Sequence, residues 1–141
     1  YIYRPFHQMA QFCNPFPVTF VALHPDGCNQ FCSYCIIPYA RGRVRSRREE
    51  DILREVGGLA ARGYKEVVLT GIHISSYGTD RGEPELLRLV RAIHGTEGIE
   101  RIRLGSLEPG IVTEEFAEEL RKLPKVALIS ICRCKAAVTL R

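Results

Sequence analysis

Apolar positions along the chain form three short blocks of the kind found in strands. Residues 18–23 read Val-Thr-Phe-Val-Ala-Leu, and the blocks at 67–71 and 99–104 are also rich in Val, Ile and Leu. The first block runs into a His-Pro-Asp-Gly turn signal, and the second ends at Thr-Gly. Short apolar or β-branched runs bounded by such residues are typical of buried strands. The pattern therefore predicts three strands.

Between and after these blocks, apolar residues recur every three or four positions. Three segments show this helical spacing, at 46–62, 84–93 and 113–123. Ser46 is followed three positions later by Glu49, the pattern of a capping box, so we expect Ser46 to cap the first helix. A proline opens the second segment, which suits a first helical turn, and another proline directly follows the third and closes it.

The order strand, helix, strand, helix, strand, helix predicts an α/β fold. Such alternation gives right-handed crossovers and a parallel sheet, whose strands are normally covered on both faces. We interpret it as the first three βα units of a partial TIM-like barrel with parallel strands, since a complete barrel takes roughly 200 residues or more. The predicted organisation is an unassigned N-terminal segment at 1–17, the partial barrel domain at 18–126 and a tail at 127–141. The neighbour of the third strand is expected beyond residue 141 or in altered form.

Composition and charge add a local feature. Of the 141 residues, 45% are hydrophobic, and the formal net charge is +4, which is ordinary for a globular domain. The apolar runs are far shorter than the roughly 20 residues that span a bilayer, so we expect a cytoplasmic protein without a membrane partner. Five arginines fall within 41–48. Arg41, Arg43 and Arg45 are candidates for binding RNA phosphates, although a solvated basic surface would explain them equally well.

Three of the six cysteines crowd into the loop after the first strand. Cys28, Cys32 and Cys35 follow the spacing CxxxCxxC, which suits metal ligands better than disulfides. Soft thiolates select zinc, copper(I) or an iron–sulfur cluster, and a closed zinc site usually takes a fourth Cys or His. None lies at a zinc-finger spacing here. Three thiolates on a four-iron cluster would leave one iron open, where a substrate or cofactor can bind.

The residues around these cysteines carry a specific resemblance. Asp-Gly-Cys-Asn at 26–29, Cys-Ile-Ile-Pro-Tyr-Ala-Arg-Gly at 35–42 and Arg-Ser-Arg at 45–47 resemble the methylthiotransferase branch of the radical S-adenosylmethionine (SAM) superfamily. Within that branch, Leu-Thr-Gly-Ile-His-Ile-Ser-Ser-Tyr-Gly at 69–78 and Arg-Leu-Gly-Ser-Leu-Glu-Pro at 103–109 are similar to the enzymes that act on N6-threonylcarbamoyladenosine in tRNA.

The resemblance, over roughly residues 26–125, implies a fragment of a tRNA methylthiotransferase on a partial radical SAM barrel. In that family a [4Fe-4S] cluster binds SAM at its open iron, and one electron then breaks the sulfur–carbon bond of SAM to give a radical that abstracts hydrogen. The protein positions the cofactor against the substrate and excludes water. The resemblance thus implies a [4Fe-4S] cluster and SAM as cofactors, with tRNA and an electron donor as partners.

The same resemblance implies roles for individual residues. The three cysteines of the CxxxCxxC motif hold the cluster, and Tyr34 lies against the adenine of SAM. Gly71, at the carboxyl end of the second strand, lets the backbone approach the methionine part of the cofactor. Ser106 and Glu108, just after the third strand, are further candidates for contacts with the cofactor. Ligands at the carboxyl ends of strands are the rule in such sheets.

Other interpretations stay open. A rival substrate within the same class is an isopentenyl-type tRNA adenosine or a ribosomal-protein aspartate, and the stretch at 69–78 argues against both. A rival from a different class is a zinc-stabilised, arginine-rich module that binds nucleic acid without catalysis. His73 is expected to be an ordinary loop residue, and Cys13 a small buried hydrophobe.

The resemblance ends after Val126. The family typically continues with a strand like CPHFHLSLQSGCDAT, whereas residues 127–141 read ALISICRCKAAVTLR. One DNA sequence can encode both strings in neighbouring reading frames offset by a single base. We therefore hypothesise that 127–141 is a frameshifted tail and that Cys132 and Cys134 are not evolved ligands, although its β-propensity can still fill the place of a fourth strand. We expect the chain alone to be inactive, because the family's sulfur-donating cluster and RNA-binding domain lie outside it.

Overall fold

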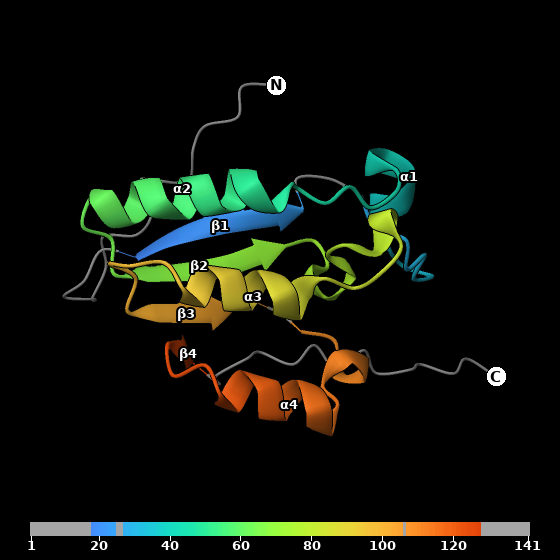
Figure 1. The fold of residues 1–141 in the computed structure, drawn as a ribbon. Helices are drawn as coiled ribbons and strands as arrows, with labels where there is room; N and C mark the ends of the chain where they lie inside the picture. Colours follow the sequence, from blue (N-terminus) through green and yellow to red (C-terminus); the bar gives the residue numbers. More distant parts are fainter. Residues whose placement is uncertain (1–17, 25–26, 106, 128–141) are drawn as a thin grey trace.

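A computed structural model describes residues 18–24, 27–105 and 107–127 of the chain. Strands and helices alternate along it, as the sequence predicts (Figure 1). In chain order the elements are β1 (Val18–His24), α1 (Ile37–Arg41), α2 (Glu49–Ala61), β2 (Glu66–Gly71), α3 (Leu86–His94), β3 (Arg101–Leu104), α4 (Glu114–Arg121) and β4 (Val126–Ala127). Single 3-10 turns lie at Ile74–Ser76, Thr79–Arg81 and Pro109–Ile111.

The described strands form one parallel sheet in the order β1-β2-β3-β4. Each strand pairs with the next along the chain, with Val67 opposite Ile102 and Ile102 opposite Val126. Between Ala22 and His24 the pairing of β1 with β2 shifts register, at the end where the cysteine loop begins. Consecutive order and parallel direction are what successive βα units of a barrel produce. The predicted α/β class and parallel sheet are confirmed.

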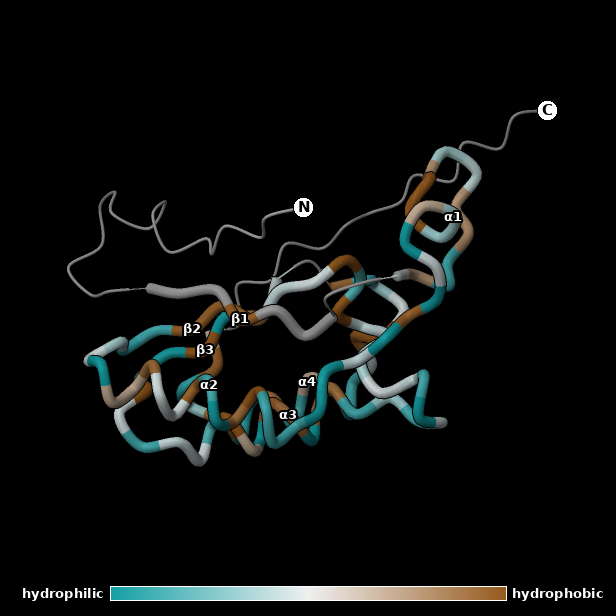
Figure 2. The backbone as a smooth tube through the Cα atoms, turned by 90° about the horizontal axis from the view of Figure 1, so that it is seen from above, coloured by the Kyte–Doolittle hydropathy of each residue, from teal (hydrophilic) through white to brown (hydrophobic). Residues whose placement is uncertain are grey.

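Helices α2, α3 and α4 all lie on one face of the sheet (Figure 2). The core lies between this face and the helices, and Val21, Leu69 and Ile102 contribute fully buried side chains from the strands. Leu59 of α2 and Leu89 of α3 pack against them. This one-sided arrangement fits the partial TIM-like barrel that the sequence predicts. Right-handed crossovers that always step to the next strand put every helix on the same side, as in a barrel wall.

The other face of the sheet carries polar side chains near the start of β2 and β3. Glu66 is almost completely buried, with 4% of its side chain exposed, and pairs with both Arg101 and Arg103. All three side chains share this face, because Glu66 stands opposite Arg101 in the register and side chains two positions apart point the same way. A buried carboxylate is costly unless it is paired, and the two arginines satisfy that requirement.

The strands and helices lie where the sequence predicts them, but some begin at a different residue. Helix α3 begins at Leu86, so Pro84 precedes the helix instead of lying in its first turn. Thr113 caps α4, as its hydroxyl accepts a hydrogen bond from the amide of Phe116. The strand β4 at Val126–Ala127 occupies the expected fourth position, while residues 128–141 lie outside the described residues, as do 1–17 with Cys13. No helix in the described part of the chain is long and apolar enough to cross a membrane.

Candidate functional site

The three motif cysteines lie in one loop that leads from β1 into α1, at the carboxyl end of the strands (Figure 1). All three thiols are free; Cys28 is buried, whereas Cys32 and Cys35 are partly exposed. The amide of Cys35 donates a 2.9 Å hydrogen bond to the carbonyl of Cys32, so these two residues share one tight turn. The sequence spacing thus becomes a compact loop with one shielded thiol and two accessible ones.

The base of this loop is closed by backbone contacts. The amide of Cys28 donates to the carbonyl of Gly42 at 3.1 Å, which joins the first cysteine to the residue after α1. Gly27 has φ 79°, and a Cβ on it would lie 1.7 Å from the carbonyl oxygen of Arg43. Only glycine fits this close approach of two backbone segments. The glycine before the first cysteine is therefore required by the geometry of the loop.

The donor set of this loop fits an iron–sulfur cluster. Among the described residues, no group of three or more His, Cys, Asp or Glu side chains is arranged to hold one ion. In a four-iron cluster each thiolate binds a different iron, so three thiols on a loop need not converge on one point. Thiolates are also the ligands that iron–sulfur clusters take. The three cysteines can therefore hold three irons and leave the fourth without a protein ligand.

A second polar cluster joins the carboxyl ends of β2 and β3. His73, two residues after Gly71, has Nδ1 2.5 Å from the hydroxyl of Ser76 and Nε2 2.8 Å from the carboxylate of Glu108. The amide of Glu108 donates to the hydroxyl of Ser75 at 3.2 Å. An ionised carboxylate only accepts, so the pair assigns the proton to Nε2. The imidazole is held on both sides and fixes one loop against the other.

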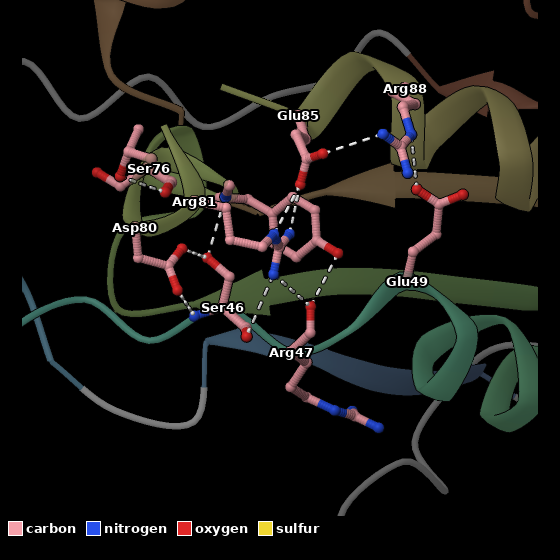
Figure 3. A network of polar contacts seen from close by, with 11 residues as sticks. Ser46, Arg47, Glu49, Ser76, Asp80, Arg81, Glu85 and Arg88 are labelled. Atoms are coloured by element: carbon pink, nitrogen blue, oxygen red, sulfur yellow. Dashed lines mark hydrogen bonds and ion pairs between the residues drawn. The ribbon is translucent and has the colours of Figure 1, made fainter. Parts of the chain in front are cut away.

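A larger polar network ties the segment after α1 to the loop between β2 and α3 (Figure 3). The amide and hydroxyl of Ser46 bond to Asp80 at 3.0 and 2.5 Å, and the amide of Gly78 donates to the same hydroxyl at 3.0 Å. The buried Tyr77 donates its hydroxyl to the carbonyl of Arg47 at 3.0 Å. The prediction that Ser46 caps the first helix is therefore wrong. Ser46 forms its hydrogen bonds with this distant loop, and α2 begins three residues later.

This network also shifts the pKa values of Tyr77 and Asp80. Burial raises the pKa of Tyr77 above its usual value, against the opposing pull of the nearby Arg81. For Asp80, partial burial raises the pKa, but the hydrogen bonds from Ser46, together with Arg81, outweigh it and hold the pKa below its usual range. The carboxylate that anchors Ser46 is thus charged over the whole neutral range.

Comparison with known families identifies the protein family to which this chain belongs. The family model of the Radical SAM superfamily matches residues 23–131, which include the end of β1, the cysteine loop and β4. The chain belongs to the radical SAM superfamily. The loop described above is the position at which the resemblance in the sequence placed the cluster ligands.

This radical SAM domain is similar to part of several curated tRNA-modifying proteins. It is 50% identical over 91 residues to a threonylcarbamoyladenosine tRNA methylthiotransferase, MtaB, of Chlamydia pneumoniae, covering 64% of this chain and 21% of that protein. It is 46% identical over 101 residues to a tRNA-2-methylthio-N(6)-dimethylallyladenosine synthase of Thermoanaerobacter sp. strain X514, covering 71% and 21%. The chain therefore spans about a fifth of the length of these relatives.

A solved structure shares the fold. The radical SAM methyltransferase TsrM of Kitasatospora setae, determined with cobalamin and a [4Fe-4S] cluster bound, matches with a TM-score of 0.59 at 23% sequence identity. The match covers 79% of this chain and 20% of TsrM. It confirms the expected partial, TIM-like radical SAM fold.

The other residues predicted to contact the cofactor differ in their surroundings. Tyr34 is 79% exposed beside the cysteines, and Gly71, the last residue of β2, is exposed. Glu108 lies at the carboxyl end of β3 but is engaged by His73, which the sequence reasoning treated as an ordinary loop residue. Ser106 lies outside the described residues. Only the short Ile-His-Ile-Ser-Ser stretch after β2 could have signalled the histidine cluster.

The predicted RNA-binding arginines all lie on the surface next to the cysteine loop. Arg41 ends α1, and Arg43 and Arg45 follow it, each with an exposed side chain. Arg47, two positions on, is instead paired with Glu55 of α2 at 2.7 Å. The basic run therefore divides into an exposed part near the cysteines and a part that anchors α2.

Proposed function

We propose that this chain is the cofactor-binding part of a radical SAM methylthiotransferase that modifies tRNA. The observation that carries the proposal is the loop with Cys28, Cys32 and Cys35 at the carboxyl end of the first strand of a radical SAM fold. The similarity to two classes of enzyme that methylthiolate tRNA supports this reaction among those of radical SAM enzymes. A protein of this kind would act in the cytoplasm, where tRNA is modified.

In this proposal the three cysteines hold a [4Fe-4S] cluster and SAM binds at its remaining iron. When bound, the cluster and SAM supply the radical chemistry that the protein's side chains cannot perform. The exposed ring of Tyr34 offers an apolar face for the adenine of SAM. Gly71 presents backbone without a side chain at the end of β2, so a ligand can approach closely.

Glu108 and His73 act in this proposal by holding the rim of the site. Their 2.8 Å contact joins the loops after β2 and β3, the two strand ends over which the cofactor would lie. A rim fixed by hydrogen bonds keeps the cofactor and substrate in one relative position, which is the contribution that the fold makes to radical chemistry. Arg41, Arg43 and Arg45 supply positive charge beside the cysteine loop for the phosphates of the tRNA.

The finer part of the proposal is the substrate, N6-threonylcarbamoyladenosine. It is supported by the resemblance of 69–78 and 103–109 to the enzymes of that branch and by the 50% identity to MtaB. The polar cluster of His73, Ser76 and Glu108, built from these two stretches, suits a site that accepts a polar modified base. The competing substrate, dimethylallyladenosine, is named in relatives of similar identity.

The first experiment is anaerobic reconstitution of the chain with iron and sulfide. Metal and sulfide analysis, with absorption and electron paramagnetic resonance spectra with and without SAM, compares the wild type with Cys32→Ala. Four irons per chain, lost in the variant and perturbed by SAM, are expected. Stoichiometric zinc without a cluster would instead support a zinc-stabilised nucleic-acid-binding module, and the proposed chemistry would be wrong.

The substrate is tested with two hybrid proteins, which carry the same segment of this chain in two different relatives. Residues 26–125 replace the matching segment in the Chlamydia pneumoniae relative and, separately, in the Thermoanaerobacter relative. Mass spectrometry of tRNA nucleosides then reports which adenosine gains a methylthio group. Methylthiolation of threonylcarbamoyladenosine by both hybrids supports the proposal. If each hybrid keeps the substrate of its recipient, this segment does not select the substrate and the finer assignment fails.

A further inference from the structure

Two aromatic rings and an arginine form an exposed stack on the outside of the cysteine loop. The ring of Phe31, in the loop, meets the ring of Tyr39, in α1, edge to face with centroids 5.7 Å apart and planes at 86°. The guanidinium carbon of Arg43 lies 5.2 Å from the centre of the Phe31 ring. Phe31 is 43% exposed and Tyr39 75% exposed. We call these three residues the aromatic–arginine surface.

The backbone under this surface holds an unusual conformation. Phe31 has φ 46°, the one positive value for a residue other than glycine in the described part of the chain. Bulky L residues rarely adopt this region, and such outliers gather at binding and catalytic sites. Here the strained residue presents its ring to solvent and does not bury it in the core, so core packing does not account for the conformation. The conformation instead leaves the ring partly exposed, in contact with Tyr39 and Arg43.

The charge near this surface is available for an anionic ligand. Arg41 and Arg43 form no ion pair with any described residue. Seven other arginines pair with carboxylates, whereas Arg48, Arg62 and Arg121 form no ion pair with a described residue; the paired ones are Arg47, Arg54, Arg81, Arg88, Arg91, Arg101 and Arg103. The charges of Arg41 and Arg43 are therefore not compensated by any described carboxylate, and they lie beside the two aromatic rings.

We propose that the aromatic–arginine surface binds an unpaired nucleotide of the tRNA substrate, next to the base that is modified. Exposed aromatic rings flanked by arginines are how proteins bind single-stranded RNA, through stacking on the bases and charge contacts with the phosphates. Phe31 belongs to the cysteine loop, and Tyr39 lies in the helix that follows it, so a base brought to the cluster would place its neighbours near these two rings. This inference rests on the proposed function, because it takes its ligand from the tRNA substrate.

Fluorescence anisotropy with a labelled tRNA anticodon stem-loop tests this assignment. Tyr39→Leu and Phe31→Leu keep an apolar side chain and remove the ring, and each should weaken binding by roughly 5- to 150-fold, as expected for the loss of one stacked base. Arg43→Gln should lower the slope of log affinity against log salt by about 1. Arg62→Gln is the matched control, since Arg62 is an exposed arginine at the end of α2 that lies away from α1 (Figure 1).

Ultraviolet cross-linking gives an independent readout. Irradiation of the bound stem-loop followed by peptide mapping should attach RNA to the segment 31–43. Cross-links confined to other segments, or aromatic variants that bind as tightly as Arg62→Gln, would overturn the inference while leaving the proposed function intact. If the variants change self-association and not RNA affinity, the surface is a protein contact and the inference is also wrong. Weakened RNA binding by a chain that takes up zinc and no cluster would uphold the surface and refute the proposed chemistry.

Discussion

Replacing Gly27 with alanine probes how the cysteine loop is built. The new methyl group would lie 1.7 Å from the carbonyl oxygen and 2.3 Å from the carbonyl carbon of Arg43. Ordinary contact begins near 3.4 Å, so the backbone at Arg43 would have to retreat by about 1.7 Å. That movement would pull Gly42 away from Cys28, whose amide donates to its carbonyl at 3.1 Å. The base of the loop would then open beside the first cysteine.

The magnitude follows from three contributions. An alanine with φ near 79° costs about 1 kcal/mol more than glycine. Losing the hydrogen bond between Cys28 and Gly42 adds about 1 kcal/mol, and the displaced backbone adds strain. We expect Gly27→Ala to lower the free energy of unfolding by about 3 kcal/mol and to abolish cluster assembly. Gly63→Ala is the matched control, because Gly63 has φ 86° with nothing within 4 Å of its added Cβ, and should cost only about 1 kcal/mol.

Urea unfolding followed by circular dichroism measures the stability of both variants. Iron and sulfide content after anaerobic reconstitution measures cluster assembly. The structural reasoning is refuted if Gly27→Ala assembles as much cluster as Gly63→Ala and unfolds at the same urea concentration. A loss of cluster in Gly27→Ala alone, with Gly63→Ala loaded like the wild type, is the expected outcome.

Three further changes have defined outcomes in urea unfolding. Tyr77→Phe removes the hydrogen bond to Arg47 and should cost about 1 kcal/mol near neutral pH. Because burial raises the pKa of Tyr77 in the folded state, the wild type should lose free energy of unfolding as the pH rises above about 10. Tyr77→Phe should not show this loss. Ser46 holds the pKa of Asp80 below its usual value, so the free energy of unfolding of the wild type should fall as the pH drops below about 4. In Asp80→Asn this dependence on acid pH should be weaker. Leu89→Ala, at a fully buried position, should cost about 2–5 kcal/mol; a smaller change would contradict the core assignment.

The sequence predicts the strands and helices well because their signals are local. The run at 67–71 becomes β2, and the helical stripe that follows residue 46 becomes α2, since both depend on the spacing of apolar side chains that the sheet then buries. Helix α1 was not predicted because five residues are too short to show a period. Ser46 was misassigned because the capping pattern is local, whereas Asp80, its actual partner, lies 34 residues away.

The candidate site divides in the same way. The cysteine loop could be singled out from its spacing and flanking residues, because all three cysteines lie within eight positions of the sequence. The contact of His73 with Glu108 spans 35 residues and arises only when β2 and β3 pair in register. The stack of Phe31 on Tyr39 depends on the left-handed backbone at Phe31, which no residue type favours except glycine. Long-range pairing and strained backbone are the parts of the site that a single sequence does not reveal.

The sheet leaves two open edges in the described part of the chain. With the order β1-β2-β3-β4, strands β1 and β4 each pair on one side only. Their outer rows of N–H and C=O groups are a template for another strand, from the rest of a barrel or from a second molecule. The seven residues of β1 offer a much longer template than the two of β4. Aggregation during purification should therefore begin along β1, and a lysine substitution on that strand should suppress it at the same total concentration.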